Sequence, residues 1–97
     1  MDFGFFDSFQ WDEGNDTKNW IKHKVSKLES EQVFFNEPLL LFHDHKHSEE
    51  EDRYYVLGHT DNHRKLMIVF THRGSQIRII SARDMSEKER KIYEAAT

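Results

Sequence analysis

The sequence predicts an α+β fold in which two N-terminal helices pack on an antiparallel sheet of about four to five strands. Three observations predict it. Two Ser-x-x-Glu capping boxes, at 26–29 and 86–89, mark helix starts near the two ends of the chain. Between them, four apolar segments typical of strands follow Pro38. The links that join these segments are too short for a crossover helix, so antiparallel pairing is expected.

The region before Pro38 is expected to form an extended arm and then two helices. Asp16 is the predicted N-cap of a helix over 18–23. Ser26 begins a second helix that runs to about Phe35, where Asn36-Glu37-Pro38 ends it. The arm is predicted from aromatic residues with the period of two that a strand shows, namely Phe3, Phe5, Phe9 and Trp11.

The region from Pro38 onward is expected to supply the rest of the sheet and a terminal helix. The polar segments between the strands read as turns or links. Ser86 begins the last helix, which carries Ile92 and Tyr93. The four expected strands are Leu39 to Phe42, Tyr54 to Gly58, Leu66 to Thr71 and Ile77 to Ala82.

Composition indicates one packed domain. A chain of 97 residues is too short for two independent cores, and we expect residues 1–8 to be an extension of a single domain over 9–97. About a quarter of the chain is Leu, Ile, Val or Phe, above the roughly 20% below which disorder is common. The absence of cysteine excludes disulfides, a thiol nucleophile and a cysteine-based zinc site. With neither a signal peptide nor an apolar run of ~20 residues, a cytoplasmic protein is expected.

Charge is distributed unevenly along the chain. The whole sequence carries a net charge of −4, which does not suggest a nucleic-acid-binding protein. Residues 1–16 contain acidic residues and no basic ones, whereas basic residues outnumber acidic ones by five over residues 64–91. This segment could form a basic face that binds phosphates. Alternatively, its charges pair within the fold and leave an ordinary solvated surface.

Histidines are the first candidates for chemistry. His43, His45 and His47 alternate in a segment expected to be extended, so their side chains would share one side, with Asp44 opposite. Zinc sites require three or four ligands in fixed positions. Because nothing in the sequence supplies a fourth ligand at a fixed spacing, we expect weak adventitious binding and no physiological metal site.

His23 is a second candidate, at the end of the first predicted helix. Lys18 and Lys22 form an i,i+4 pair beside the pair Asn19–His23. Nearby ammonium groups favour a neutral imidazole, the form that a general base requires. The alternative is an ordinary surface helix that packs through Trp20 and Ile21.

The remaining candidates are charged residues in or near strands. Glu51 and Arg53 are two apart and share a face, so they could cooperate in catalysis or form a pair. Arg73, Arg78 and Arg83 could bind phosphates, for which the guanidinium group is suited. Because Arg78 lies within an apolar strand, it requires a carboxylate partner or an opening onto a cleft.

These residues, in their order, resemble the BrnT family, ribonuclease toxins of bacterial type II toxin–antitoxin pairs with a RelE-like fold. The resemblance covers roughly residues 9 to 94 and is most specific at Arg78-Ile79-Ile80-Ser81-Ala82-Arg83. Other matching motifs are Phe9-Gln10-Trp11-Asp12, Asn19, Lys22-His23-Lys24-Val25-Ser26, Glu37-Pro38-Leu39, His47-Ser48-Glu49-Glu50-Glu51-Asp52-Arg53-Tyr54, Gly58, Glu89-Arg90 and Tyr93-Glu94.

The resemblance implies an endoribonuclease toxin that cleaves mRNA without a cofactor or metal. It also implies a BrnA-like ribbon-helix-helix antitoxin that neutralises the toxin and carries it to operator DNA. The chain differs from the family pattern at Asn15, Lys24 and Lys27. An alternative function is therefore that of a catalytically degenerate binding module that acts only with its antitoxin in operon regulation.

Resemblance and charge together predict an active site on the sheet face that the first two helices leave uncovered. The expected catalytic residues are His23, Glu51, Arg53 and Arg83. The expected RNA-binding residues are Lys18, Lys22, Arg73, Arg78 and Tyr93, the last as a surface on which a base stacks.

Overall fold

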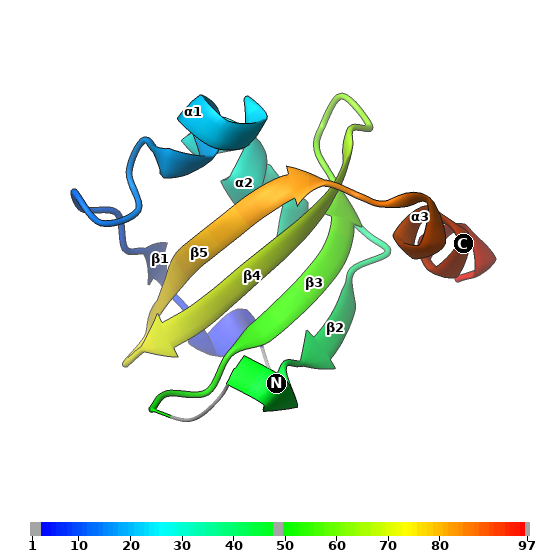
Figure 1. Cartoon of the computed structure of the whole chain (residues 1–97). Helices are drawn as coiled ribbons and strands as arrows, with labels where there is room; N and C mark the ends of the chain where they lie inside the picture. The colour runs from blue at the N-terminus through cyan, green and yellow to red at the C-terminus, as the bar shows by residue number, and fades with distance from the viewer. Residues whose placement is uncertain (1–2, 48–49, 97) are drawn as a thin grey trace.

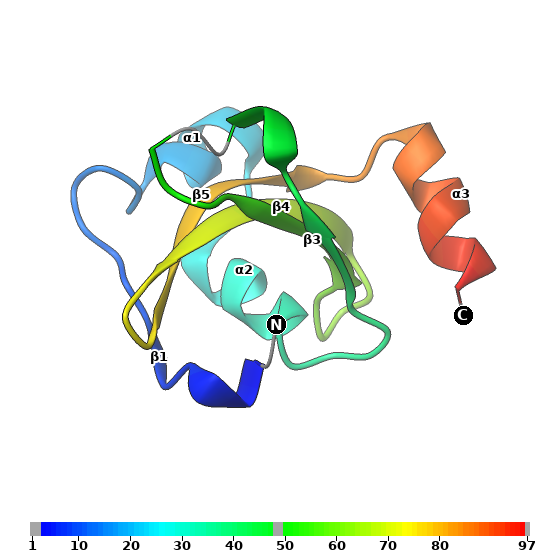
Figure 2. The same ribbon diagram turned by 90° about the horizontal axis from the view of Figure 1, so that it is seen from below.

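A computed structural model describes residues 3–47 and 50–96 and has the predicted order of strand, two helices, four strands and helix. One five-stranded sheet, in the order β1-β5-β4-β3-β2, carries α2 on one face, while α3 lies beyond its end (Figures 1 and 2). The elements are η1 (Phe3–Phe5), β1 (Ser8–Phe9), α1 (Lys18–His23), α2 (Lys27–Val33), β2 (Leu40–His43), η2 (His45–His47), β3 (Tyr54–His59), β4 (Lys65–Arg73), β5 (Gln76–Asp84) and α3 (Glu87–Ala95). The α+β prediction is confirmed.

The sheet is mixed, because its first strand runs parallel to its neighbour. β2, β3, β4 and β5 pair in antiparallel succession, as the short links predict. β1 pairs with β5 in parallel over two residues, opposite Gln76 and Ile77. The expected extended arm is thus only partly correct. A turn in which the Phe6 N–H donates to the Phe3 carbonyl brings Phe3, Phe6 and Phe9 against one core cluster.

Each face of the sheet carries its own apolar cluster. The larger cluster lies between the sheet and α2 and contains Val33, Val56, Ile68 and Phe70. The smaller one is on the opposite face. It comprises Leu57, Met67, Met85 and Tyr93, with partly buried Leu40, Phe42, Tyr55 and Val69 packed against it. We call this second surface the open face, because neither α1 nor α2 covers it. Among the residues described, no helix is long and apolar enough to cross a bilayer.

Two asparagine side chains protect the edge of β5 where β1 ends. Asn15 and Asn19 are each only 3% exposed. Asn15 Nδ2 donates to the Ile79 carbonyl at 3.0 Å, and Asn19 Oδ1 accepts from the Ala82 N–H at 3.0 Å. These amides take the place of a neighbouring strand, which satisfies an edge that would otherwise be open to pairing. Asn15 therefore has a structural role.

Both predicted capping boxes are present, but the predicted cap of α1 is wrong. Ser26 and Ser86 each exchange hydrogen bonds with the Glu three residues later. The N-cap of α1 is Thr17, without a side-chain cap bond. Asp16 instead pairs with Lys27 Nζ at 2.6 Å, so this contact between the two helices competes with capping.

The C-terminus of α1 depends on a lysine in the left-handed conformation. Lys24 has φ 56° and ψ 37°, and its N–H donates to the Trp20 carbonyl. Its ammonium group lies 5.4 Å from the centroid of the Trp20 ring. Left-handed backbone costs an ordinary residue about 1–2 kcal/mol, whereas glycine adopts it freely.

We therefore expect Lys24→Gly to be more stable than Lys24→Ala by about 1 kcal/mol in free energy of unfolding. Both variants lose the contact with Trp20, so their difference isolates the backbone conformation. Urea unfolding of the two purified variants measures it. Equal stabilities would contradict a strained residue at this position.

Candidate functional site

Arg83 lies near the end of β5, on the open face beside the start of α3. Its side chain is 35% exposed, and its guanidinium binds Glu89 through two hydrogen bonds of 2.8 and 3.1 Å. The bond from Arg83 is the largest of the contacts that hold the pKa of Glu89 below its usual value. Arg83 is thus a cation in a fixed orientation at the junction of sheet and helix.

His23 is half-buried at the last position of α1, near the same end of the sheet. Its backbone carbonyl accepts a hydrogen bond of 3.2 Å from Arg64 Nη2. Arg64 also binds the Lys24 carbonyl, Glu29 and both carboxylate oxygens of Asp84. These bonds connect α1, α2 and β5 through one guanidinium group, which fixes the backbone on which His23 stands. Sequence reasoning missed Arg64, whose partners are all distant in sequence.

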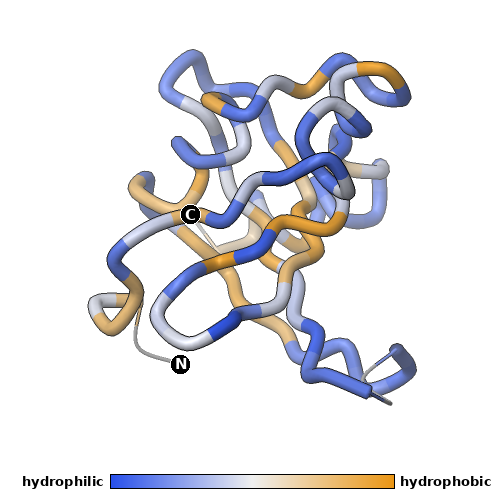
Figure 3. Tube along the Cα trace, turned by 90° about the vertical axis from the view of Figure 1, so that its left-hand side faces the viewer, coloured by the Kyte–Doolittle hydropathy of each residue, from blue (hydrophilic) through white to orange (hydrophobic). Residues whose placement is uncertain are grey.

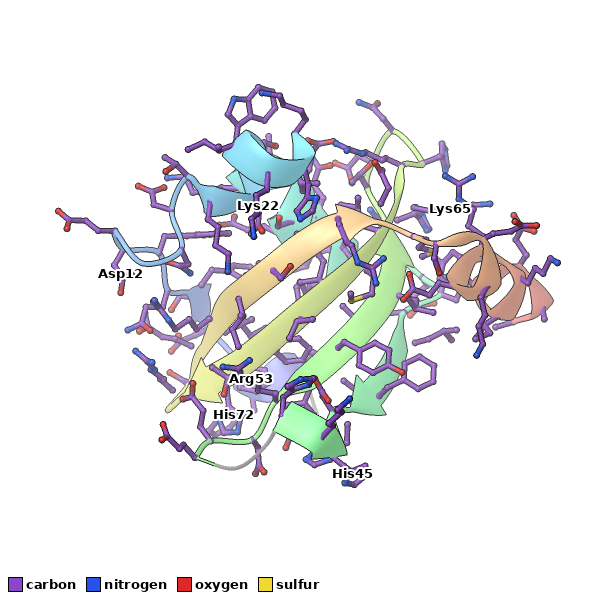
Figure 4. All side chains as sticks on the ribbon, in the orientation of Figure 1. Asp12, Lys22, His45, Arg53, Lys65 and His72 are labelled. Atoms are coloured by element: carbon purple, nitrogen blue, oxygen red, sulfur yellow. The ribbon has the colours of Figure 1, made fainter. Side chains whose placement is uncertain are left out.

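Glu51 and Arg53 lie at the opposite end of the sheet. Arg53 precedes β3 and lies in front of the open face (Figure 4), and Glu51 is 3.9 Å from Arg73 Nε. Both line a shallow cleft with Lys46, His47 and Glu50, in a hydrophilic part of the chain (Figure 3). From strand spacing and register, the Cα atoms of Arg53 and Arg83 are roughly 16 Å apart. The four expected catalytic residues therefore form two groups.

The two lysines of α1 lie along the outer edge of β5. Lys18 Nζ donates to the Ile80 carbonyl at 3.3 Å. Lys22 is exposed and extends from α1 toward β5 (Figure 4). Lys18 thus lies beside the middle of β5, and both ammonium groups lie along the outer edge of this strand, where they could contact a phosphate backbone.

The side chains of Arg78 and Tyr93 are both engaged in contacts within the fold. Arg78 binds both carboxylate oxygens of Asp12, at 2.8 and 3.0 Å, and this bond lowers the pKa of Asp12. Tyr93 is 2% exposed, and its hydroxyl donates to the Pro38 carbonyl at 2.6 Å. The expectation that a base stacks on Tyr93 is corrected, because the amphipathic helix α3 turns this ring into the core.

Most of the basic side chains in the segment 64–91 are paired with acidic side chains within the fold. Six of its eight basic residues form ion pairs, so the local excess of five does not produce an open basic face. The pairs are Arg64 with Asp84 and Glu29, Lys65 with Glu94, Arg73 with Glu51, Arg78 with Asp12, Arg83 with Glu89 and Lys91 with Glu87.

The histidines at 43–47 do not align as an extended segment would align them. Residues 45–47 form a 3-10 turn, in which His47 approaches Asp44 at 3.1 Å while His43 contacts His45 at 2.9 Å. In the described part of the chain, no group of three or more histidine or acidic residues could hold a metal ion.

A pair of aromatic rings on the open face was not among the expected site residues. Phe42 and Tyr55 are opposite one another on β2 and β3, and their rings are parallel to within 15° with centroids 4.8 Å apart. The alternation of side chains along a strand could have placed Tyr55 on the face opposite Val56. The partner Phe42 required knowledge of the strand register.

The chain is similar to known proteins both in sequence and in fold. Residues 11–89 match the family described as the ribonuclease toxin BrnT of type II toxin–antitoxin systems. The crystal structure of the ribonuclease toxin BrnT from Brucella abortus is similar, with a TM-score of 0.60 and 23% identity over 82% of this chain and 97% of that chain. At this identity the likeness establishes the fold. No curated protein sequence matches. Of the motifs quoted for the resemblance, Ser48 and Glu49 lie outside the described residues.

Proposed function

Since the chain belongs to the BrnT family of ribonuclease toxins of type II toxin–antitoxin systems, we propose that it is an endoribonuclease that cleaves mRNA and thereby inhibits translation and growth. The observation that carries the proposal is the family match over 79 residues, 11 to 89, which includes His23, Arg53 and Arg83. The proposal is also supported by the open face, because Arg53 and Arg83 both lie on it and neither α1 nor α2 covers it.

The proposed reaction is attack of a ribose 2′-hydroxyl on the adjacent phosphodiester. A base removes the 2′-hydroxyl proton, the 2′-oxygen forms a bond to phosphorus, and the bond from phosphorus to the 5′-oxygen breaks. An acid gives that oxygen a proton. The products are a 2′,3′-cyclic phosphate and a 5′-hydroxyl. The steps need two proton transfers and a cation near the phosphate, and a metal ion is not required.

Arg83 and His23 are proposed to act at the scissile phosphate. Arg83 would donate hydrogen bonds to the phosphoryl oxygens as negative charge develops on them. His23 would act as base or acid, held by the bonds that Arg64 makes to the end of α1. Arg53 and Glu51, at the other end of the open face, would act on a neighbouring part of the same strand. Lys18 and Lys22 would bind its backbone.

The proposed partner is a BrnA-like ribbon-helix-helix antitoxin that blocks the RNA site and binds operator DNA, so that the chain reaches DNA only through it. The alternative of a degenerate binding module rested on Asn15, Lys24 and Lys27. Asn15 protects the edge of β5, Lys24 forms the end of α1 and Lys27 pairs with Asp16. None of these contacts removes a group from the proposed chemistry.

We expect the purified chain to cleave single-stranded RNA at an unchanged rate in excess EDTA. The substrate is an RNA oligonucleotide, and a matched oligonucleotide with 2′-deoxy sugars should remain intact because it lacks the nucleophile. Product analysis should show 2′,3′-cyclic phosphate ends. Loss of cleavage on chelation, restored by one divalent ion, would contradict the mechanism, and absence of any cleavage would favour the degenerate module.

A further inference from the structure

The aromatic pair on the open face has the geometry of a platform for a nucleic-acid base. We propose that Tyr55, supported from behind by Phe42, stacks an unpaired base of the RNA substrate. The inference rests on the proposed function and adds a binding residue to it.

The two rings are stacked on each other and remain partly accessible. Phe42 and Tyr55 are directly opposed across two antiparallel strands, with ring centroids 4.8 Å apart and an interplanar angle of 15°. Both rings are half-buried, and they pack against the cluster that contains Leu57 and Met67. α2 lies on the opposite face and α3 lies at the end of the sheet (Figures 1 and 2), so neither of these two helices lies over the middle of the open face, and both aromatic residues keep partial exposure.

Cations lie on both sides of Tyr55. Arg53 is two residues earlier on the same face, about 7 Å away along the strand. Arg83 lies two strands across, roughly 12 Å away between Cα atoms by register and strand spacing. A base on Tyr55 would therefore have one guanidinium near the phosphate on each of its sides. Single-stranded nucleic acids bind to this combination of a ring and flanking cations.

The other exposed or aromatic candidates lack one of these features. Tyr54 stacks on Phe70 beneath the sheet, and Tyr93 is buried. Trp20 is 51% exposed but belongs to α1, and the cation over its ring is Lys24 of the same helix. Of the three tyrosines, Tyr55 alone has an accessible ring between the two arginines of the open face.

The test is binding of a 2′-O-methyl RNA hexanucleotide, which cannot be cleaved, measured by fluorescence anisotropy. Tyr55→Leu keeps apolar bulk and removes the flat ring, and it should weaken binding about tenfold or more. Tyr55→Phe should bind within about twofold of the unaltered chain. An abasic hexamer of equal charge should bind the chain and Tyr55→Leu equally, because only the stacked base is lost.

Val69→Ala is the matched control, since Val69 opposes Tyr55 on the same face and offers no ring. It should leave affinity unchanged. Phe42→Leu provides a second variant if Tyr55→Leu does not fold, and it should weaken binding to RNA but not to the abasic hexamer. A folded Tyr55→Leu chain that binds RNA normally would overturn the inference and leave the proposed function standing. If Tyr55→Leu loses only antitoxin binding and binds RNA normally, the stacking inference is overturned and Tyr55 belongs to a protein interface. If the unaltered chain binds no RNA, both the inference and the proposed function are overturned.

Discussion

Replacement of Arg83 by alanine should abolish growth inhibition by this chain. If Arg83 stabilises the charge that develops on the scissile phosphate, its loss should slow cleavage by about 10²–10³-fold, the usual effect of removing such a donor. If growth inhibition results from the proposed RNA cleavage, a rate reduced to that extent should no longer stop growth. The measurement is growth after induction of each variant without antitoxin, with RNA cleavage by the purified chain as the direct readout.

Folding is the main alternative explanation, because Arg83 also holds α3 through Glu89. An ion pair of this partial exposure contributes about 1 kcal/mol or less, so the variant should remain folded by circular dichroism. Glu89→Gln is the matched control. It breaks the same ion pair from the other side, and glutamine still completes the capping box with Ser86.

Glu89→Gln should therefore remain toxic, whereas Arg83→Ala should not. If both variants lose toxicity, the pair is needed for structure and Arg83 has no separate chemical role. If a folded Arg83→Ala chain keeps full toxicity, the proposed mechanism loses its stabilising cation. A lysine at position 83 should restore part of the rate, because it keeps the charge without the paired donors of the guanidinium.

The elements of this fold could be predicted where their signals are local. Both capping boxes consist of residues three apart, and both appear as predicted. Asp16 failed as a cap because its partner Lys27 lies on another helix. The arm with odd-numbered aromatics is only partly correct for a different reason, since a turn at Phe3–Phe6 brings Phe6 to the same cluster as Phe3 and leaves Phe5 63% exposed.

The candidate site could be predicted only in part, because its geometry depends on strand register and on distant ion pairs. The sequence places Arg53 just before one expected strand and Arg83 at the end of another, but only pairing through β4 shows that they share the open face at opposite ends. Residue type alone also does not distinguish a buried aromatic ring from an accessible one. Tyr93 and Tyr55 are the same residue type, and the packing of α3 decides which of them a base could reach.

The second large effect concerns Arg64, and it is an effect on stability. Arg64→Ala should lower the free energy of unfolding by about 2–3 kcal/mol, since charged hydrogen bonds contribute about 1.5–3 kcal/mol each and these are partly exposed. The guanidinium binds Asp84 and Glu29 and also the carbonyls that end α1. Its loss removes all these contacts together and leaves two carboxylates without their shared partner. For a chain whose total stability is expected near 5–10 kcal/mol, this loss is large.

The effect should depend on pH, because Arg64 acts on the ionised forms of its partners. Its hydrogen bond is the main cause that lowers the pKa of Asp84, and it helps to lower the pKa of Glu29 against the opposing effect of burial. A carboxylate with a lowered pKa stabilises the folded state above its unfolded pKa and loses that contribution as pH falls through the folded value. The difference between the unaltered chain and Arg64→Ala should therefore be complete at pH 7 and shrink as pH falls below about 4.

Urea unfolding at several pH values measures this difference, with Arg73→Ala as the control. Arg73 is exposed and its carboxylate partner is 3.9 Å away, so its loss should cost less than about 1 kcal/mol at any pH. Arg64→Lys should recover only part of the stability, because one ammonium group cannot reach the two carboxylates and the two carbonyls at once. A cost of Arg64→Ala that is no larger than that of Arg73→Ala would show that α1, α2 and β5 are held together by their apolar contacts alone. In that case the position of His23 would not depend on Arg64.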